Sequence, residues 1–149
     1  MNSAKNIKLF LVDDDQMYLK FLEAEFRQNV DSETTEFTIE TYSTGELCIA
    51  NLAHNPDVII LDYNLDGIDK NAMNGLETLD KIKETNPDIP VVILSAQDKI
   101  DVAIDCMHHQ ALDYVVKSET AFIRLQKIIA TVLKYRKMEK ALNWYMDKM

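Results

Sequence analysis

The chain has 149 residues, of which 47% are hydrophobic and 28% are charged, with three glycines and three prolines. This composition is typical of one globular domain and excludes a disordered or collagen-like chain. The net charge is −9, but residues 1–118 carry 22 acidic and 9 basic side chains, whereas residues 119–149 carry 3 acidic and 7 basic ones. Because so acidic a body repels nucleic acid, we expect no direct nucleic-acid binding.

Neither a membrane segment nor a secretory signal is expected. The longest apolar runs have four residues, whereas a helix that spans a bilayer needs about 20. The first run continues into Asp13, Asp14 and Asp15 without a small-residue cleavage site, so we expect a cytoplasmic protein. Cys48 and Cys106 lack the spacing of a metal site and are expected to be small buried hydrophobic residues.

Five short apolar or β-branched runs alternate with stretches that have helical periodicity. The predicted strands are residues 7–12, 37–42, 58–61, 90–94 and 113–116. The first, third and fourth are almost continuously apolar, as strands buried on both faces are, whereas the second alternates like an edge strand with one wet face. Such alternation predicts an α/β fold, a doubly wound parallel sheet with helical crossovers.

Helix positions follow from apolar spacing and from capping signals. Between the strands, apolar residues recur three or four positions apart, and Ser43 followed by Glu46 predicts a capping box that opens a helix over residues 44–53. In the last segment the apolar residues continue at spacings of three and four to the end of the chain; they are Phe122, Leu125, Ile129, Val132, Tyr135, Met138, Leu142, Tyr145 and Met149. We therefore expect a C-terminal helix that extends past the domain. It would be either a dimerising or signalling helix or an amphipathic linker to an output domain.

Polar residues stand at the carboxyl ends of the predicted strands, where parallel sheets bind their ligands. Asp13, Asp14, Asp62, Ser95 and Lys117 occupy these positions. Carboxylates that converge there repel one another unless a hard cation such as Mg²⁺ neutralises them. Asp62 is the natural nucleophile, since a carboxylate can form an acyl phosphate, with Lys117 as a positive charge and Ser95 as a hydroxyl donor for phosphoryl oxygens. The pattern predicts a phosphoryl-acceptor site.

Four motifs, in order and at matching spacing, resemble the receiver domains of two-component response regulators, most closely the small chemotaxis-type single-domain members. They are Leu11-Val12-Asp13-Asp14, the run from Pro56 to Asp62, Val92-Ile93-Leu94-Ser95-Ala96, and Asp113-Tyr114-Val115-Val116-Lys117. The resemblance implies a flavodoxin-like sheet of strand order 2-1-3-4-5 with five helices. It also implies a receiver domain over residues 1–136, followed by a helical extension or linker over residues 137–149.

The resemblance assigns roles to residues of this chain. Asp62 would accept a phosphoryl group from a phosphohistidine of a histidine kinase or a histidine phosphotransfer protein. Mg²⁺ would be bound by Asp14, Asp62 and the backbone carbonyl of Asn64, and by Asp13 through water. Ser95 and the amide of Ala96 would hold phosphoryl oxygens, and Lys117 would pair with the acyl phosphate.

Tyr114 matches the aromatic switch position, which turns inward as Ser95 moves toward the phosphate. Phosphorylation would then bias the surface formed by the fourth helix, fifth strand and fifth helix, which controls a downstream protein. That surface or the C-terminal helix could also form a homodimer. The only chemistry implied is self-phosphorylation and autodephosphorylation, so we expect no enzyme in the ordinary sense.

Three departures from the family pattern stand out. Asp62 and Gly75 are 13 residues apart, so the loop over residues 66–73 is longer than usual, and we expect it to form a lid or partner contact beside the site. Gln110 replaces a glycine where a left-handed residue is expected. Ser118 replaces a proline and is expected to cap the last helix.

Two alternatives remain open from the sequence. Asp13 and Asp15 have the spacing of the nucleophile and acid of phosphatases that resemble the haloacid dehalogenase superfamily, but that reading leaves Asp62 without a role and puts Met17 at an unusual position. The other alternative is a pseudo-receiver that never takes phosphate and acts as an interaction module.

Overall fold

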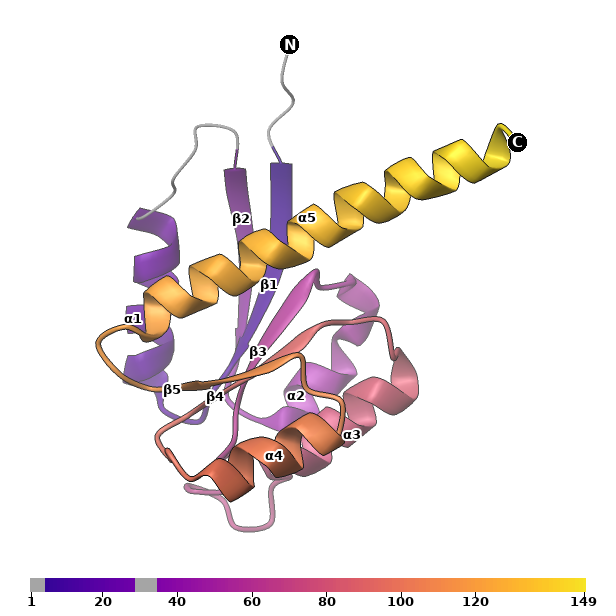
Figure 1. Ribbon diagram of the computed structural model, residues 1–149. Helices are drawn as coiled ribbons and strands as arrows, with labels where there is room; N and C mark the ends of the chain where they lie inside the picture. The colour runs from indigo at the N-terminus through magenta and orange to yellow at the C-terminus, as the bar shows by residue number, and fades with distance from the viewer. Residues whose placement is uncertain (1–4, 29–34) are drawn as a thin grey trace.

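Strands and helices alternate along the chain in the computed structural model, which describes residues 5–28 and 35–149 (Figure 1). The elements in chain order are β1 (Lys5–Val12), α1 (Gln16–Gln28), β2 (Thr35–Tyr42), α2 (Gly45–Ala50), the 3-10 turn η1 (Leu52–His54), β3 (Val58–Asp62), α3 (Gly75–Thr85), β4 (Val91–Ser95), α4 (Ile100–His108), β5 (Asp113–Val116) and α5 (Ala121–Asp147). All five predicted strands are present, each within two residues of its expected bounds.

The strands form one parallel sheet in the order β2-β1-β3-β4-β5. This is the flavodoxin-like order that the resemblance implied, with β3 in the centre. The register pairs Val12 with Leu61, and Ser95 with Val116, so the carboxyl ends of the strands lie at a common edge of the sheet. The residues that follow those ends are therefore brought together.

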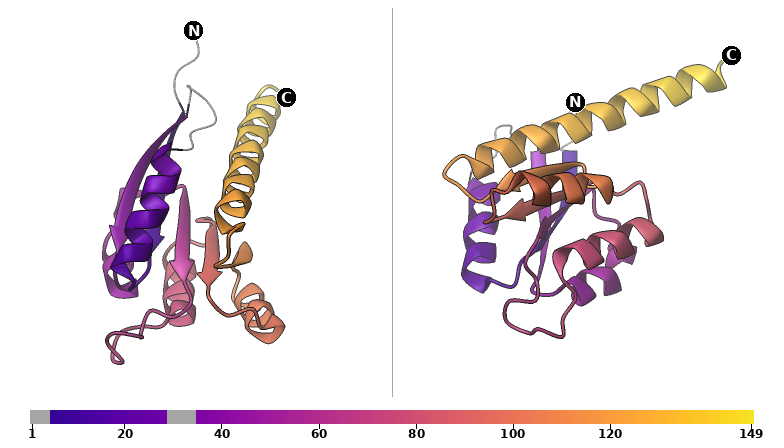
Figure 2. Two further views of the ribbon diagram at one scale, coloured as in Figure 1. Left: turned by 90° about the vertical axis from the view of Figure 1, so that its left-hand side faces the viewer. Right: turned by 60° about the horizontal axis from the view of Figure 1, so that its bottom comes forward.

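Helices cover both faces of the sheet (Figures 1 and 2). Alternate strand residues supply the two cores because side chains alternate across a strand. Leu9, Leu11 and Ile60 pack with α1 and α5, whereas Phe10 and Ile59 pack with α2, α3 and α4. Every residue of β3 and β4 is buried, as their continuous apolar sequences predicted. The site at their ends thus stands on two completely buried strands.

The helix ends correct two expectations. The N-cap of α2 is Thr44 and not Ser43: Thr44 Oγ1 accepts a hydrogen bond from Leu47 N at 3.1 Å, and the expected partner Glu46 instead accepts one from Met73 N. The helix ends at Ala50 and continues only as the turn η1. A reciprocal capping box is found at the start of α3, between Asn74 and Glu77.

The prediction that Ser118 caps the last helix was also wrong. The N-cap of α5 is Thr120, without a side-chain capping bond, and Ser118 Oγ lies 3.2 Å from Thr120 Oγ1. Gln110 does adopt the left-handed conformation, with φ 74°. Cys48 and Cys106 are both fully buried, as expected.

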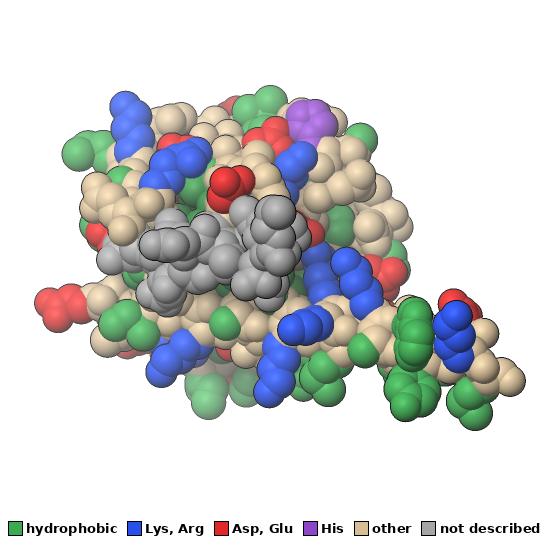
Figure 3. Space-filling model, turned by 90° about the horizontal axis from the view of Figure 1, so that it is seen from above, with side chains coloured by type: hydrophobic (Ala, Val, Ile, Leu, Met, Phe, Trp, Pro, Cys, Tyr) green, Lys and Arg blue, Asp and Glu red, His purple; other side chains and the backbone are tan. Residues whose placement is uncertain are grey.

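The last helix extends beyond the domain, as its spacing predicted. Leu125, Ile129 and Val132 are buried against the sheet. Arg136 then donates hydrogen bonds to the carboxylate and to the carbonyl oxygen of Asp57, which precedes β3. Past Arg136, residues 137–149 (the tail) extend away from the body with hydrophobic and basic side chains along them (Figure 3). No helix among the described residues has the length and apolarity to cross a membrane.

Candidate functional site

Three carboxylates meet at the carboxyl edge of the sheet. Asp13 and Asp14 follow β1, and Asp62 is the last residue of β3. One oxygen from each lies within 4.8 Å of the other two. Asp13 and Asp62 are each only 4% exposed, and Asp14 is half-buried. The sequence prediction that these residues converge is therefore confirmed in geometry.

Lys117 completes the cluster from the end of β5. Its backbone amide donates to Ser95 O at 2.7 Å, which fixes its position beside β4. Its Nζ donates to Asp13 Oδ2 at 2.8 Å and lies 3.7 Å from Asp62 Oδ1. The other oxygen of Asp13 accepts a hydrogen bond from Asp15 N at 2.9 Å. Both oxygens of Asp13 are thus engaged, and Asp62 is left with the weaker contacts.

The electrostatics of the site favour a bound cation. Burial and the nearby charge of Asp13 raise the pKa of Asp62 to about 7. Burial by itself would lower the pKa of Lys117, but the hydrogen bond to Asp13 and the charges of both aspartates raise it above its ordinary value. Three close oxygen ligands with an unfavourable mutual charge fit Mg²⁺, which prefers one or two carboxylates completed by water and phosphate oxygens.

The turn after Asp62 lies within reach of the same site. Asn64 N donates to Asp62 Oδ1 at 3.3 Å. Leu65 is buried and anchors the start of the long loop. Within the loop, a Cβ built on Gly67 would lie 3.1 Å from Asp14 Oδ2, so the loop runs directly beside the carboxylates. Its position agrees with the expectation of a segment next to the site, while its role as a lid stays a prediction.

Ser95 and Tyr114 both make hydrogen bonds with the backbone of Gln97. Ser95, at the end of β4, is completely buried, and its Oγ accepts a hydrogen bond from Gln97 N at 3.1 Å. The hydroxyl of Tyr114 donates to the carbonyl oxygen of the same Gln97 at 2.7 Å. Tyr114 is 8% exposed, so its side chain lies inside the fold. Ala96, between Ser95 and Gln97 in the sequence, is exposed. Movement at Ser95 would therefore disturb the backbone of Gln97, the residue that Tyr114 also contacts.

One neighbour of Lys117 was not anticipated from the sequence. The ring of Tyr18, in the first turn of α1, lies with its centroid 4.3 Å from Lys117 Nζ. The two residues are 99 positions apart, and an aromatic residue in an amphipathic helix carries no signal that distinguishes such a contact from ordinary packing.

Asp15 has a structural use that weakens the phosphatase alternative. Its Oδ1 accepts hydrogen bonds from Met17 N at 3.0 Å and Tyr18 N at 3.2 Å, so the carboxylate caps α1. The arrangement does not present Asp15 as an acid beside Asp13. His109, at the C-cap of α4, makes a hydrogen bond of 2.7 Å with Asp80.

The chain belongs to the response regulator receiver domains. The model of that family matches residues 9–132, which is most of the chain and includes Asp13, Asp14, Asp62, Ser95 and Lys117. Two-component signalling and the fold that the resemblance implied are thereby established. Membership also sets aside the alternative of a dehalogenase-like phosphatase.

The curated relatives are much longer than this chain. LuxO of Vibrio campbellii is 34% identical over 80 residues, which cover 53% of this chain and 17% of that protein. ZraR of Klebsiella oxytoca is 27% identical over 139 residues, covering 93% of this chain and 29% of the relative. NtrC of Salmonella typhimurium is 35% identical over 81 residues, covering 54% and 16%. The chain spans less than a third of the length of each of these regulators.

Solved receiver domains have the same fold. A BeF3-activated DrrB receiver domain is 26% identical with a TM-score of 0.70, covering 87% of this chain and 99% of that one. CheY of Borrelia burgdorferi, solved in a complex with CheX, BeF3 and Mg²⁺, is 24% identical with a TM-score of 0.67, covering 84% and 88%. NtrX of Brucella abortus is 21% identical with a TM-score of 0.77, covering 97% of this chain and 31% of that one.

Proposed function

We propose that this domain accepts a phosphoryl group on Asp62 from the phosphohistidine of a cytoplasmic histidine kinase or phosphotransfer protein, in a reaction that depends on Mg²⁺. The observation that carries the proposal is the placement of Asp62 at the end of the central strand, with Asp13, Asp14 and Lys117 around it. Mg²⁺ would be held by the Asp14 and Asp62 carboxylates and the Asn64 carbonyl, with Asp13 acting through water. When bound, it would neutralise negative charge between the carboxylates and the incoming phosphoryl oxygens.

In the transfer itself, a carboxylate oxygen of Asp62 forms a bond to phosphorus while the bond from phosphorus to the imidazole nitrogen of the donor breaks. The electron pair of the broken bond stays on the imidazole, which then takes up a proton. Lys117 is placed to pair with a phosphoryl oxygen, because its Nζ is already between Asp13 and Asp62. Ser95 Oγ and the Ala96 amide would hold further oxygens. In this proposal the domain modifies only its own Asp62 side chain, and water later hydrolyses the acyl phosphate.

The output of the reaction would be a change at the surface formed by α4, β5 and α5. For Ser95 to reach a phosphoryl oxygen, its hydrogen bond with Gln97 N must change, and Gln97 O is the acceptor for Tyr114. Ile100, Ile104 and Met107 of α4 are exposed hydrophobic residues on the neighbouring surface. A downstream protein would bind this surface preferentially in either the phosphorylated or the unphosphorylated conformation, and its binding would raise the population of that conformation.

The test is intact-mass spectrometry after incubation with acetyl phosphate and Mg²⁺. We expect one added phosphoryl group on the wild type, none on Asp62→Asn, and none with a chelator. Asp15→Asn is the matched control: it lies beside the cluster and keeps its capping oxygen, so it should be phosphorylated. Absence of the adduct, together with absence of beryllofluoride binding, would favour the pseudo-receiver. An adduct on Asp13 would contradict the assignment of Asp62.

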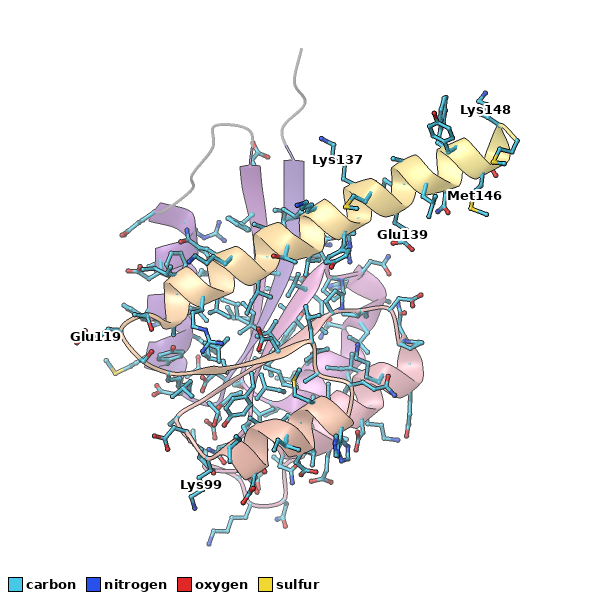
Figure 4. All side chains as sticks on the ribbon, viewed as in Figure 1. Lys99, Glu119, Lys137, Glu139, Met146 and Lys148 are labelled. Carbon is cyan, nitrogen blue, oxygen red and sulfur yellow. The ribbon has the colours of Figure 1, made fainter. Side chains whose placement is uncertain are left out.

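We further propose that the tail pairs with the tail of a second copy. An apolar stripe begins one residue before Arg136 and continues along the tail. It consists of Tyr135, Met138, Leu142, Tyr145 and Met149, which are 56% to 99% exposed. The stripe has the spacing of the core of a two-stranded coiled coil. Four of its members also line a shallow groove of about 630 Å³. Figure 4 shows Lys137 and Glu139 on opposite sides of the tail, so charges flank it.

The charges beside the stripe favour a parallel pair of identical helices. If Tyr135, Leu142 and Met149 are the a positions of a heptad, the residue directly before each of them is a g position. In a parallel pair, a g residue faces the e residue five positions later on the other helix. Lys134 would then face Glu139 of a second copy, and the contact would occur twice by symmetry. An antiparallel pair over the same stretch would bring Lys134 near Lys148 of the second copy, which is unfavourable. This complementarity supports the proposal that the exposed stripe pairs with another copy of the same chain.

Sedimentation equilibrium of the chain tests the pairing. We expect Leu142→Asp to shift the protein toward monomer, since the change puts a charge in the core. Glu139→Lys should also weaken association, and Lys134→Glu in the same chain should restore it. Lys140→Glu, which lies on the far side of the helix from the stripe, is the control. A monomer at all concentrations, or a failure of the charge exchange to restore association, would contradict the pairing.

A further inference from the structure

The Tyr18 ring lies over the ammonium group of the lysine that serves the acceptor site. The distance of 4.3 Å from Lys117 Nζ to the ring centroid is within the range at which a cation is attracted to an aromatic face. The lysine side chain is only 19% exposed. On its other sides the ammonium faces Asp13 at 2.8 Å and Asp62 at 3.7 Å. Its environment therefore consists of two carboxylates and one ring.

The first turn of α1 holds the ring in place. Asp15 caps the helix by accepting hydrogen bonds from Met17 N and from Tyr18 N itself. The next residue, Leu19, is buried in the sheet core. The half-buried Tyr18 also packs against that core. The ring thus has little freedom to leave the lysine.

We infer that Tyr18 is a positioning residue for phosphoryl transfer, which acts by holding the Lys117 ammonium close to Asp62 and by covering it from water. This inference rests on the proposed phosphorylation of Asp62. An ammonium group has three N–H donors and a flexible stem. One donor is engaged by Asp13, and the ring occupies a side from which water would otherwise bind. The ammonium is thereby kept near the oxygen that accepts the phosphoryl group, and it does not have to be reoriented during the transfer.

The chemistry of the ring face separates this role from ordinary packing. Tyr18→Phe keeps the aromatic face and removes only the hydroxyl, whereas Tyr18→Leu keeps apolar packing and removes the face. Acetyl phosphate is a suitable donor because it is too small to depend on a docking surface. We expect the initial phosphorylation rate to fall about 3- to 10-fold in Tyr18→Leu and to stay within about twofold of the wild type in Tyr18→Phe.

Phe21→Leu is the matched control. Phe21 lies one turn further along α1, is 54% exposed and contacts the Tyr18 ring but not Lys117 in the described structure. This variant should be phosphorylated at the wild-type rate. Calorimetric titration with Mg²⁺ should give the same affinity for all three variants and the wild type, since Tyr18 provides no metal ligand, and it checks that the carboxylates are intact.

A spectroscopic measurement tests the contact without phosphorylation. The ε-methylene protons of Lys117, assigned in ¹³C-lysine-labelled protein by their absence from Lys117→Arg, should be shifted upfield by the ring in the wild type and in Tyr18→Phe. In Tyr18→Leu they should move to the range of the other lysines. If the wild type takes up no phosphate, the proposed function fails while this measurement still decides the contact.

Two results would overturn the inference. Equal slowing in Tyr18→Phe and Tyr18→Leu would show that the ring face is not what matters. Unchanged rates in Tyr18→Leu would show that Lys117 is positioned without Tyr18, even where the upfield shift is present in the wild type.

Discussion

Gly75 lies against the backbone of Asp62. A Cβ built on Gly75 would lie 2.4 Å from the Asp62 carbonyl oxygen and 2.6 Å from Tyr63 Cα. The Gly75 amide donates to Tyr63 O at 2.9 Å, which closes the long loop onto the strand that carries the acceptor. The glycine is therefore needed for close approach of two backbones and not for an unusual backbone angle, since its φ is not positive.

Gly75→Ala should destabilise the protein by about 1–3 kcal/mol, because backbone atoms cannot move aside as a flexible side chain can. Urea denaturation measures the loss. Gly67→Ala is the control in the same loop: its Cβ would meet only the end of the Asp14 side chain, at 3.1 Å, and should cost less. Equal losses for the two variants would contradict the close-approach explanation.

The pH dependence of stability should reveal the burial of Asp62. Its pKa is about 7 in the folded protein because of burial and Asp13, compared with about 3.9 in an unfolded chain. The folded state thus binds this proton more tightly, and the stability of the metal-free protein falls as pH rises from about 4 to 7. Asp62→Asn removes that fall.

We therefore expect Asp62→Asn to stabilise the metal-free protein more at pH 8 than at pH 5, by at least about 1 kcal/mol. The measurement is urea denaturation in a chelator at the two pH values. A stability difference between variant and wild type that does not change with pH would show that Asp62 titrates normally.

Magnesium should stabilise the folded chain through the carboxylate cluster. Ligands that bind only the folded state raise the melting temperature as their concentration exceeds the dissociation constant. We expect a rise with millimolar Mg²⁺ that disappears in Asp14→Asn and remains in Asp15→Asn, since the Asp15 carboxylate caps α1. Thermal unfolding followed by circular dichroism measures both. The same rise in Asp14→Asn would place the bound cation elsewhere.

Gln110 carries a backbone conformation that suits glycine. Its φ is 74°, and its side chain is exposed after α4. Gln110→Gly should stabilise the protein by about 1 kcal/mol, because relief of the left-handed strain exceeds the entropy that glycine adds to the unfolded chain. Gln110→Ala keeps the Cβ and should give no gain. Chemical denaturation of the two variants measures their free energies of unfolding. A similar gain in both would show that loss of the Gln110 side chain, and not relief of the left-handed backbone, stabilises the protein.

The sequence was sufficient for the sheet because its signal is distributed over many residues. The continuous apolar runs of β3 and β4 and the alternation of β2 predicted central and edge strands, and the strand ends predicted which polar residues meet. Asp13, Asp62 and Lys117 could be placed together because parallel strands end at one edge, whatever the details of the loops.

The features that the sequence did not predict correctly are individual capping bonds and contacts between distant side chains. Both Ser43 and Thr44 have a hydroxyl that can cap α2, and only the backbone angles of the turn select Thr44. Ser118 was expected to cap α5, but the helix begins two residues later than such a cap requires. The contacts of Tyr18 with Lys117 and of Arg136 with Asp57 join distant segments, and no local pattern marks them.

The hydrogen bonds between Arg136 and Asp57 mark the point from which the tail projects away from the body. Arg136 is the last residue of α5 with a hydrogen bond to the body among the described residues, so a tilt of the tail would pivot there. At a rise of 1.5 Å per residue, Met146 lies about 15 Å further along the axis, and a tilt of about 10° at the pivot would displace it by about 2.6 Å. Asp57 comes directly before β3, and Asp62 is the last residue of that strand. A change of about 10° in the tilt of the tail would thus displace the far end of the chain by a few ångströms.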